Sequence, residues 1–203
     1  YGLPGQDAAG ALADIDAALG LASAQVSHYQ LTLEPGTSFA AKPQPALPDD
    51  EVTERMLEGC QSRLDAAGYL RYEVSAYARP GRECVHNLGY WRFGDYLGLG
   101  AGAHGKRSAL DAAGRVRSIH RTEQVREPRR YQRDPAATLK VREVDLAQRP
   151  FEFMLNALRL KDGFNLTDFV ERTGLAMTSI QQNLQEAEKK GMIGRDLHRV
   201  WPT

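Results

Sequence analysis

The stretch from Cys84 to Gly105 constrains the fold of this chain more than any other part of the sequence. It reads CVHNLGYWRFGDYLGLGAGAHG, with aromatic side chains crowded into its first half and glycines recurring through its second half. Glycine destabilises the interior of helices and strands, and it is placed where the backbone turns or approaches another group closely. Aromatic side chains with polar tips bury a flat body and keep a hydrogen-bonding group. The stretch therefore predicts an irregular binding site with flat walls and a backbone floor.

Charge is balanced over the 203 residues, with 26 basic and 26 acidic side chains, so a polyelectrolyte is not expected as the main partner. The distribution is uneven, because residues 1–70 are mainly acidic and residues 106–133 are mainly basic. This asymmetry predicts an internal docking surface or a local anion site.

The chain has two cysteines, Cys60 and Cys84, which are too few for a disulfide framework. No stretch of the sequence has the pattern of a signal peptide or of a membrane span. These features predict a cytoplasmic protein. The first residue is not methionine, and Tyr1–Gln6 opens in the middle of a motif. We therefore expect a fragment that lacks an N-terminal half.

A parallel strand–helix–strand unit is expected at the start of the chain. Tyr1–Gln6 reads as a strand end and a tight turn, and apolar spacing predicts a helix over Asp7–Leu19, ended by Gly20. Gln25–Leu33 alternates like a strand. The proline-rich segment Ala41–Pro48 is expected to be a linker or lid.

The middle of the chain predicts one helix, one strand and one hairpin. Acidic residues at 49–51 begin a helix that continues to Ala67 and is ended by Gly68. Tyr69–Ala76 alternates like a single strand, and a turn near Asp111–Gly114 predicts a hairpin. Pro128 and Pro135 are expected to keep the end of the basic segment irregular.

The last part of the chain predicts a winged-helix module of three helices and a hairpin. The first helix begins at Pro150 and carries a set of apolar residues, namely Phe151, Met154, Leu155, Leu158 and Leu160. The other helices are expected at Leu166–Arg172 and Thr178–Lys190, and the hairpin at Met192–Pro202. Glutamates balance lysines on the last helix, so packing against the rest of the protein is favoured over DNA binding.

The pattern HNxxYWRFGDYxGxGxGAHG resembles the radical-SAM family of oxygen-independent coproporphyrinogen oxidase-like proteins, and its heme-chaperone branch in particular. The resemblance extends from Tyr1 to about Trp201. It implies a mixed α/β and α+β fold: the C-terminal part of an incomplete (β/α) barrel at residues 1–48, an α+β region at 49–147, and the winged-helix-like module at 148–203.

His86 is the leading candidate ligand for heme iron, and its aromatic neighbours are candidates for contact with the porphyrin face. The heme-binding set implied by the resemblance is His86, Asn87, Tyr90 and Trp91. A structural histidine in an aromatic cluster is the alternative for His86, and the Cys84 thiolate is a competing iron ligand. His104 lies between glycines, and we expect it to occupy a tight turn.

The arginines of residues 106–133 are expected to be a solvated surface, with porphyrin propionates as one alternative partner and nucleic acid as a less favoured one. The resemblance also implies that Gly2, Gln6 and Thr32 form one wall of an S-adenosylmethionine site. Its 4Fe-4S cluster needs a cysteine triplet that this chain does not contain, so cluster and S-adenosylmethionine are expected in the full-length parent only.

The resemblance implies a heme chaperone that binds heme for transfer to a recipient protein. The alternative is an oxygen-independent coproporphyrinogen III oxidase, a radical-SAM decarboxylase of porphyrin biosynthesis; a DNA-binding regulator is a third interpretation, resting on the winged helix alone. The fragment by itself is expected to be inactive as an enzyme and to bind no nucleic acid. A homodimer and a peripheral position at a membrane during heme delivery remain open alternatives.

Overall fold

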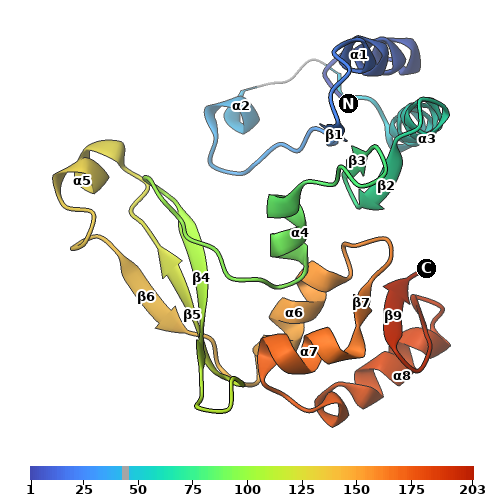
Figure 1. Ribbon diagram of the computed structural model, residues 1–203. Helices are drawn as coiled ribbons and strands as arrows, with labels where there is room; N and C mark the ends of the chain where they lie inside the picture. The colour runs from blue at the N-terminus through green and yellow to red at the C-terminus, as the bar shows by residue number, and fades with distance from the viewer. Residues whose placement is uncertain (43–45) are drawn as a thin grey trace. The chain divides into compact units, whose positions relative to one another are not determined.

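Within residues 1–42 and 46–203, which this computed structural model describes, the strands form three small antiparallel sheets with helices packed beside them (Figure 1). Contacts divide the chain into two units, Tyr1–Cys84 and Val85–Thr203, called unit 1 and unit 2 below. The linker or lid expected at Ala41–Pro48 includes residues 43–45, which lie outside the described part of the chain. The three-part domain division remains a prediction.

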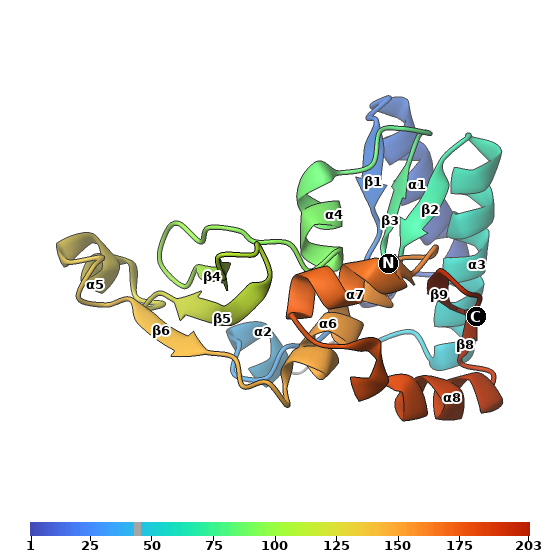
Figure 2. The same ribbon diagram turned by 60° about the horizontal axis from the view of Figure 1, so that its bottom comes forward.

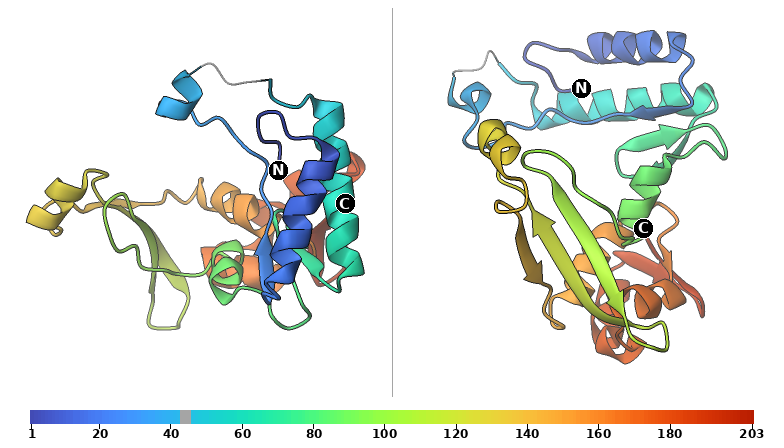
Figure 3. Two further views of the ribbon diagram at one scale, coloured as in Figure 1. Left: turned by 90° about the horizontal axis from the view of Figure 1, so that it is seen from above. Right: turned by 60° about the vertical axis from the view of Figure 1, so that its left-hand side comes forward.

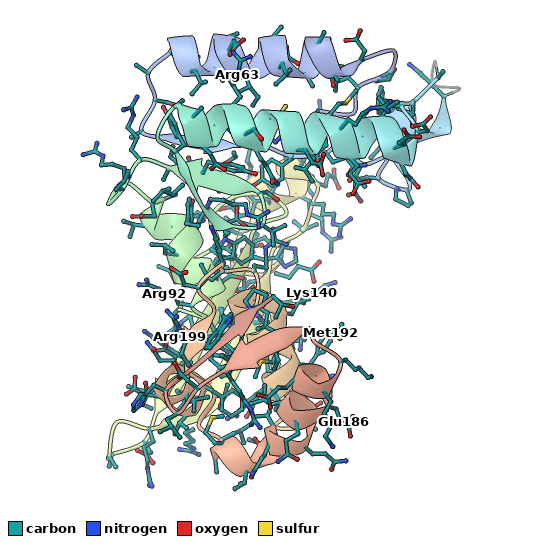
Figure 4. The ribbon with its side chains drawn as sticks, turned by 90° about the vertical axis from the view of Figure 1, so that its right-hand side faces the viewer. Arg63, Arg92, Lys140, Glu186, Met192 and Arg199 are labelled. Carbon is teal, nitrogen blue, oxygen red and sulfur yellow. The ribbon has the colours of Figure 1, made fainter. Side chains whose placement is uncertain are left out.

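Two long helices, α1 (Ala8–Gly20) and α3 (Asp50–Ala66), lie side by side in unit 1 (Figure 3). Each is capped by an aspartate, because Asp7 accepts a hydrogen bond from the Gly10 amide and Asp49 accepts one from the Val52 amide, both at 2.8 Å. Arg63 of α3 forms an ion pair with Asp16 of α1 at 2.7 Å (Figure 4). Both predicted helices are confirmed.

The apolar faces of α1 and α3 form the core of unit 1 together with two buried tyrosines. Its fully buried members include Ile15, Met56, Cys60, Leu64, Tyr69 and Tyr77. Gly68 follows α3 with a φ of 81°, as the capping pattern predicts. Gly20, which was expected to end the first helix, is instead its last helical residue. The residue with left-handed backbone after α1 is Ala22, with a φ of 51°.

The sheet of unit 1 runs in the order β1 (Gln25–Ser27), β3 (Ala76–Ala78), β2 (Leu70–Glu73), as Figure 2 shows. All its strand pairs are antiparallel. The single strand expected at Tyr69–Ala76 is therefore wrong: the chain reverses after Glu73, and the alternation of the sequence continues across a hairpin. β1 is also shorter than the expected strand Gln25–Leu33.

The expected parallel pairing at the start of the chain is limited to one pair of hydrogen bonds. The Tyr1 amino group donates to the Tyr29 carbonyl, and the Leu31 amide donates to the Tyr1 carbonyl, each at 2.8 Å. Two bonds on either side of Gln30 are the parallel pattern. A turn after Glu34 leads into the short helix α2 (Ser38–Ala41).

Unit 2 begins with α4 (Val85–Trp91) and continues into a sheet of β4 (His104–Leu110), β5 (Val116–Glu123) and β6 (Lys140–Glu143) (Figure 3). The β4–β5 hairpin turns at Asp111–Gly114, which confirms that prediction. The segment after β5 is more regular than expected, because Pro128 occupies the first turn of α5 (Pro128–Arg133), where proline is tolerated.

The rest of unit 2 contains three helices and a three-stranded sheet. The helices are α6 (Arg149–Ala157), α7 (Leu166–Thr173) and α8 (Gln181–Lys189), with a 3₁₀ turn at Met177–Ser179. The sheet order is β7 (Phe164–Asn165), β9 (Arg199–Pro202), β8 (Ile193–Arg195), and Met192 and Arg199 mark its hairpin in Figure 4. The predicted helices and hairpin are present at nearly the expected positions.

The fully buried face of α6 carries residues that the sequence analysis did not single out. Phe153 and Ala157 are fully buried, whereas Phe151 and Leu155 are 69% and 62% exposed. Phe153 makes edge-to-face contacts with three other phenylalanines of the core, Phe93, Phe164 and Phe169, at centroid distances of 5.6, 5.0 and 5.3 Å. Phe153 is therefore at the centre of the aromatic core of unit 2.

Candidate functional site

The side-chain rings of His86, Tyr90 and Tyr96 form a row on and beside α4, which is called the ring row below. His86 and Tyr90 lie one helical turn apart, with ring centroids 4.8 Å apart. Tyr90 in turn stacks on Tyr96 at 4.0 Å. Since His86 was expected in a loop, its place on a helix is a correction. The aromatic-and-glycine composition suggested irregular chain, but the seven residues of α4 contain only one glycine, Gly89, which has open space around it.

The other candidate heme residues are distributed around this row. Trp91 lies edge-on to Tyr90 at 6.3 Å, and the guanidinium of Arg159 covers its ring at 4.4 Å. Asn87 is partly buried on α4. His86 itself is exposed, so its imidazole is accessible to a ligand. The runner-up Cys84 is partly buried and is the last residue of unit 1.

A buried lysine fixes the chain beyond α4. The Lys106 side chain is 1% exposed and donates hydrogen bonds to the Phe93 carbonyl at 3.0 Å and to Asp95 at 2.9 Å. Its ammonium also lies 4.2 Å from the centre of the Phe93 ring. Phe93 has a φ of 56°, a conformation that side chains rarely adopt. These contacts stabilise Phe93 in that conformation, with its ring in the core.

Burial and the hydrogen bond between Lys106 and Asp95 both change the pKa values of these two side chains. Burial lowers the pKa of the Lys106 ammonium, and the hydrogen bond to Asp95 opposes that change. Burial also favours a higher pKa for Asp95, but hydrogen bonds from Lys106 and from the amide and hydroxyl of Ser108 outweigh it and lower the pKa. Asp95 is therefore the anion of this pair.

His104 begins strand β4 and does not occupy the tight turn expected for it. The turn precedes it, where Gly100 and Gly102 have φ values of 108° and 70°. The glycine after it is required for a different reason, because a Cβ at Gly105 would lie 2.4 Å from the Thr122 hydroxyl on the neighbouring strand. His104 itself is exposed and lines a groove beside the sheet.

Within the basic segment, Arg121 is partly buried and forms hydrogen bonds to two other side chains. Its guanidinium donates to Glu152 of α6 at 2.7 and 2.9 Å and to the Tyr96 hydroxyl at 2.9 Å. It thereby connects the ring row to α6. Arg142 also contacts Glu152, at 3.4 Å. Most other arginines of the segment are exposed, in agreement with the solvated surface expected for them.

The three residues suggested for an S-adenosylmethionine wall lie in unit 1 near the parallel-type bonds at Tyr1. Gly2 is buried, and its φ of 78° favours glycine. The Gln6 side chain accepts from the Leu3 amide at 3.1 Å and donates to Asp14 at 2.8 Å, so it supports its own turn. Thr32 is exposed.

No group of three histidine, cysteine, aspartate or glutamate side chains in the described part of the chain could hold a metal ion. Cys60 is buried between α1 and α3, and burial raises the pKa of its thiol. Cys84 is the other thiol, and two thiols are fewer than the three or four thiolates that a 4Fe-4S cluster takes. No helix among the described residues is long and apolar enough to cross a membrane.

Sequence reasoning missed Lys106, Asp95, Arg121 and Glu152 as parts of this region. Asp95 lies inside the aromatic stretch, and Lys106 directly follows its last glycine, which was a usable signal for a buried pair. Arg121 and Glu152 are separated by two elements, and no local pattern pairs them.

Comparison with known proteins gives consistent results. The model of the HemN C-terminal domain matches residues 144–203. The chain is 42% identical over 193 residues to the heme chaperone HemW of Escherichia coli and 39% identical to that of Haemophilus influenzae, with 95% of this chain covered in each case. It spans about half the length of these relatives, 49% in both.

Among solved structures, the chain matches one described as coproporphyrinogen III oxidase (HemN) from Escherichia coli, a radical SAM enzyme. The TM-score is 0.71 at 14% identity, covering 100% of this chain and 50% of that one. At this identity the match supports the fold alone.

Proposed function

We propose, from the premise that this chain is a relative of the heme chaperone HemW within the coproporphyrinogen oxidase-like radical-SAM family, that its protein binds heme and transfers it to a recipient protein. The observation that carries the proposal is the ring row on α4. An exposed imidazole stands at the end of a stack of aromatic rings, which is a suitable arrangement for an iron ligand beside a flat macrocycle.

His86 is the proposed axial ligand in this arrangement. Tyr90 and Trp91 are placed to contact the porphyrin, and Asn87, on the same helix, is the remaining member of the heme-binding set. Cys84 is the competing ligand, since thiolates also bind heme iron.

The test is the spectrum of the chain with hemin. We expect His86→Ala to change the Soret band and to weaken binding by about tenfold, which corresponds to roughly 1.4 kcal/mol. His198→Ala is the matched control, because His198 is an exposed histidine of the C-terminal hairpin. An unaltered spectrum for His86→Ala together with a changed one for Cys84→Ala would transfer the assignment to the thiolate. If the wild-type chain binds no hemin, the proposed function fails.

We also propose the finer architecture implied by the family. Residues 1–48 form the end of an incomplete (β/α) barrel, residues 49–147 an α+β region, and residues 148–203 a winged-helix-like module. The single parallel-type bond pair at Tyr1 supports the barrel, and the order of α6, β7, α7, α8 and the β8–β9 hairpin supports the module.

S-adenosylmethionine and a 4Fe-4S cluster are proposed for the full-length parent alone. Gly2, Gln6 and Thr32 would supply one wall of the S-adenosylmethionine site, and this chain would supply no cluster ligand. The proposed partners are heme and a heme-accepting protein, and no nucleic acid, because Glu186 (labelled in Figure 4) and Glu188 balance Lys189 and Lys190 at the end of α8.

A further inference from the structure

The short helix α4 does not by itself fix the direction of the His86 imidazole. It contains seven residues, none of them fully buried, and His86 is exposed in its first turn. Helices of this length are stable only through packing against other elements. A metal-binding histidine keeps its orientation through the groups around it, and losing such a group commonly costs about tenfold or more in metal affinity. The orientation of His86 must therefore come from the rest of the ring row.

Tyr90 contacts His86 within the ring row, and Tyr96 in turn holds Tyr90. The rings of Tyr90 and Tyr96 are stacked, with centroids 4.0 Å apart and planes at 25° to each other. Burial, the neighbouring Tyr96 phenol and a hydrogen bond with its hydroxyl raise the pKa of the Tyr90 phenol. The neutral Tyr90 hydroxyl is therefore the donor in that bond, and one residue holds both the ring and the hydroxyl of Tyr90.

Tyr96 is fixed through both its backbone and its hydroxyl. Its amide donates to the Lys106 carbonyl at 2.9 Å, and its carbonyl accepts from the Lys106 amide at 3.0 Å, so its backbone is paired with β4. Its hydroxyl accepts from the Arg121 guanidinium at 2.9 Å, and Arg121 donates to Glu152 of α6 at 2.7 and 2.9 Å. The side chains of Arg121 and Glu152 are 22% and 16% exposed, so solvent screens their charges only in part. A continuous series of contacts therefore leads from α6 to the ring row.

We propose that Tyr96 is a positioning residue for heme ligation by His86. Its hydroxyl, held by Arg121, fixes Tyr90, and Tyr90 keeps the imidazole in the direction in which it binds iron. The inference rests on the proposed heme binding and adds the group that orients the ligand. Tyr96 acts through Tyr90 and is assigned no contact with the iron.

Tyr96→Phe tests the proposal, because it removes the hydroxyl and leaves the ring that stacks on Tyr90. The measurement is a Soret titration of the full chain with hemin. We expect an altered Soret band and about tenfold weaker binding, which is the effect of losing a group that orients a metal ligand. Glu152→Gln, which removes the charge that holds Arg121, should change both in the same direction.

A double-mutant cycle shows whether Tyr96 acts through His86. The double variant His86→Ala/Tyr96→Phe should bind hemin as His86→Ala does, because no ligand is left to orient. The matched control is Tyr131→Phe, which removes a hydroxyl that accepts from the Gly100 amide at 3.1 Å, outside the ring row. This control should leave hemin binding unchanged. Thermal unfolding of the two single tyrosine variants checks that a weaker affinity is not a loss of folded protein.

Proton NMR of the hemin-free chain gives a second readout that does not depend on heme. The Cε1 proton of His86, assigned by its absence in His86→Ala, belongs to a ring 4.8 Å from that of Tyr90 and should carry a ring-current shift. In Tyr96→Phe this signal should move toward that of a freely rotating histidine, and in Tyr131→Phe it should stay in place.

The outcomes separate this inference from the proposed function. If the wild-type chain binds no hemin, the heme chaperone is rejected, and Tyr96 has no ligation to support. If hemin binds and His86→Ala weakens it, but Tyr96→Phe keeps the wild-type affinity and Soret band, the positioning role alone is overturned. An unmoved His86 signal in Tyr96→Phe also overturns that role. So does a loss of affinity that is as large in the His86→Ala background as in the wild type, because Tyr96 then acts independently of His86.

Discussion

At the scale of single residues, Gly98 and Gly89 occur in the same glycine-rich stretch but have opposite surroundings. A Cβ at Gly98 would lie 2.1 Å from the His104 carbonyl oxygen, a backbone atom that cannot rotate away. A Cβ at Gly89, on α4, would instead point into open space.

We expect Gly98→Ala to destabilise unit 2 by about 2 kcal/mol, because the start of β4 must shift. Gly89→Ala is the control and should be neutral or stabilising by about 1 kcal/mol, since alanine favours a helix. Denaturant unfolding measures both. Equal midpoints for the two variants would contradict the close contact at Gly98.

Asp95 predicts how unit 2 responds to acid. Its pKa is lowered in the folded chain, so the unfolded state takes up a proton at higher pH than the folded state does. The stability that it contributes is complete above its ordinary pKa of about 4 and is lost as the pH falls through the lowered value. Asp95→Asn should therefore flatten the acid limb of a stability–pH curve for unit 2. A curve with the same acid slope in both proteins would show that another carboxylate is responsible.

The sequence was informative about residues that act locally and less informative about those that act across the fold. The helix starts near Asp7 and Asp49 and the terminator Gly68 depend on interactions within one helical turn, and their positions were predicted; that both aspartates are N-caps was not. The environment of Phe93 depends on Lys106, which approaches only after β4 has paired. His86 was expected in irregular chain because of the aromatic and glycine composition around it, and the spacing of His86 and Tyr90, which fits one helical turn, was not used.

At the scale of elements, Arg149 holds α6, α7 and β5 together. Its side chain is 2% exposed and donates to the carbonyls of Thr173 and Arg117, each at 3.0 Å. An apolar side chain at position 149 could not donate these hydrogen bonds. The carbonyls of Thr173 and Arg117 would then lose the Arg149 guanidinium as their donor.

Arg149→Met should destabilise unit 2 by about 3 kcal/mol, because a charge-assisted pair of hydrogen bonds is lost from a buried place. Arg129→Met, on the exposed face of α5, is the matched control and should change stability by less than about 0.5 kcal/mol. Thermal unfolding followed by circular dichroism compares them. Similar melting temperatures for the two variants would refute the role given to Arg149.

The ends of helices were predictable where a capping or terminating residue marked them. The side of a helix that becomes buried was not predictable. Gly174 ends α7 in the left-handed conformation that glycine commonly adopts after a helix. The face that α6 buries depends on phenylalanines from other elements, and the list of apolar residues in the helix did not distinguish the exposed Phe151 and Leu155 from the buried ones. The hairpin of β2 and β3 was missed because no glycine or asparagine marks its turn at Val74 and Ser75.

At the scale of the whole molecule, the buried residues form two clusters that share no member. One contains Leu64 and belongs to unit 1; the other contains Phe153 and belongs to unit 2. Separate cores predict separate responses to cavity-forming substitutions.

Leu64→Ala is expected to lower the stability of unit 1 by about 3 kcal/mol, and Phe153→Ala that of unit 2 by about 4 kcal/mol. Hydrogen exchange detected by mass spectrometry should show faster exchange in α3 for the first variant and in α7 for the second, each with little change in the other unit. Uniform loss of protection throughout the chain in either variant would argue for a single cooperative unit.

The contact between Gly174 and β5 has a consequence for how unit 2 can move. A Cβ at Gly174 would lie 2.2 Å from the Val116 carbonyl oxygen, so α7 meets the sheet at backbone distance, and Arg149 bonds to both sides of that junction. The sheet cannot swing away from the helices without breaking these contacts. A relative movement of β5 and α7 would therefore separate both Arg149 hydrogen bonds at once, so the sheet and the helices of unit 2 are expected to move together.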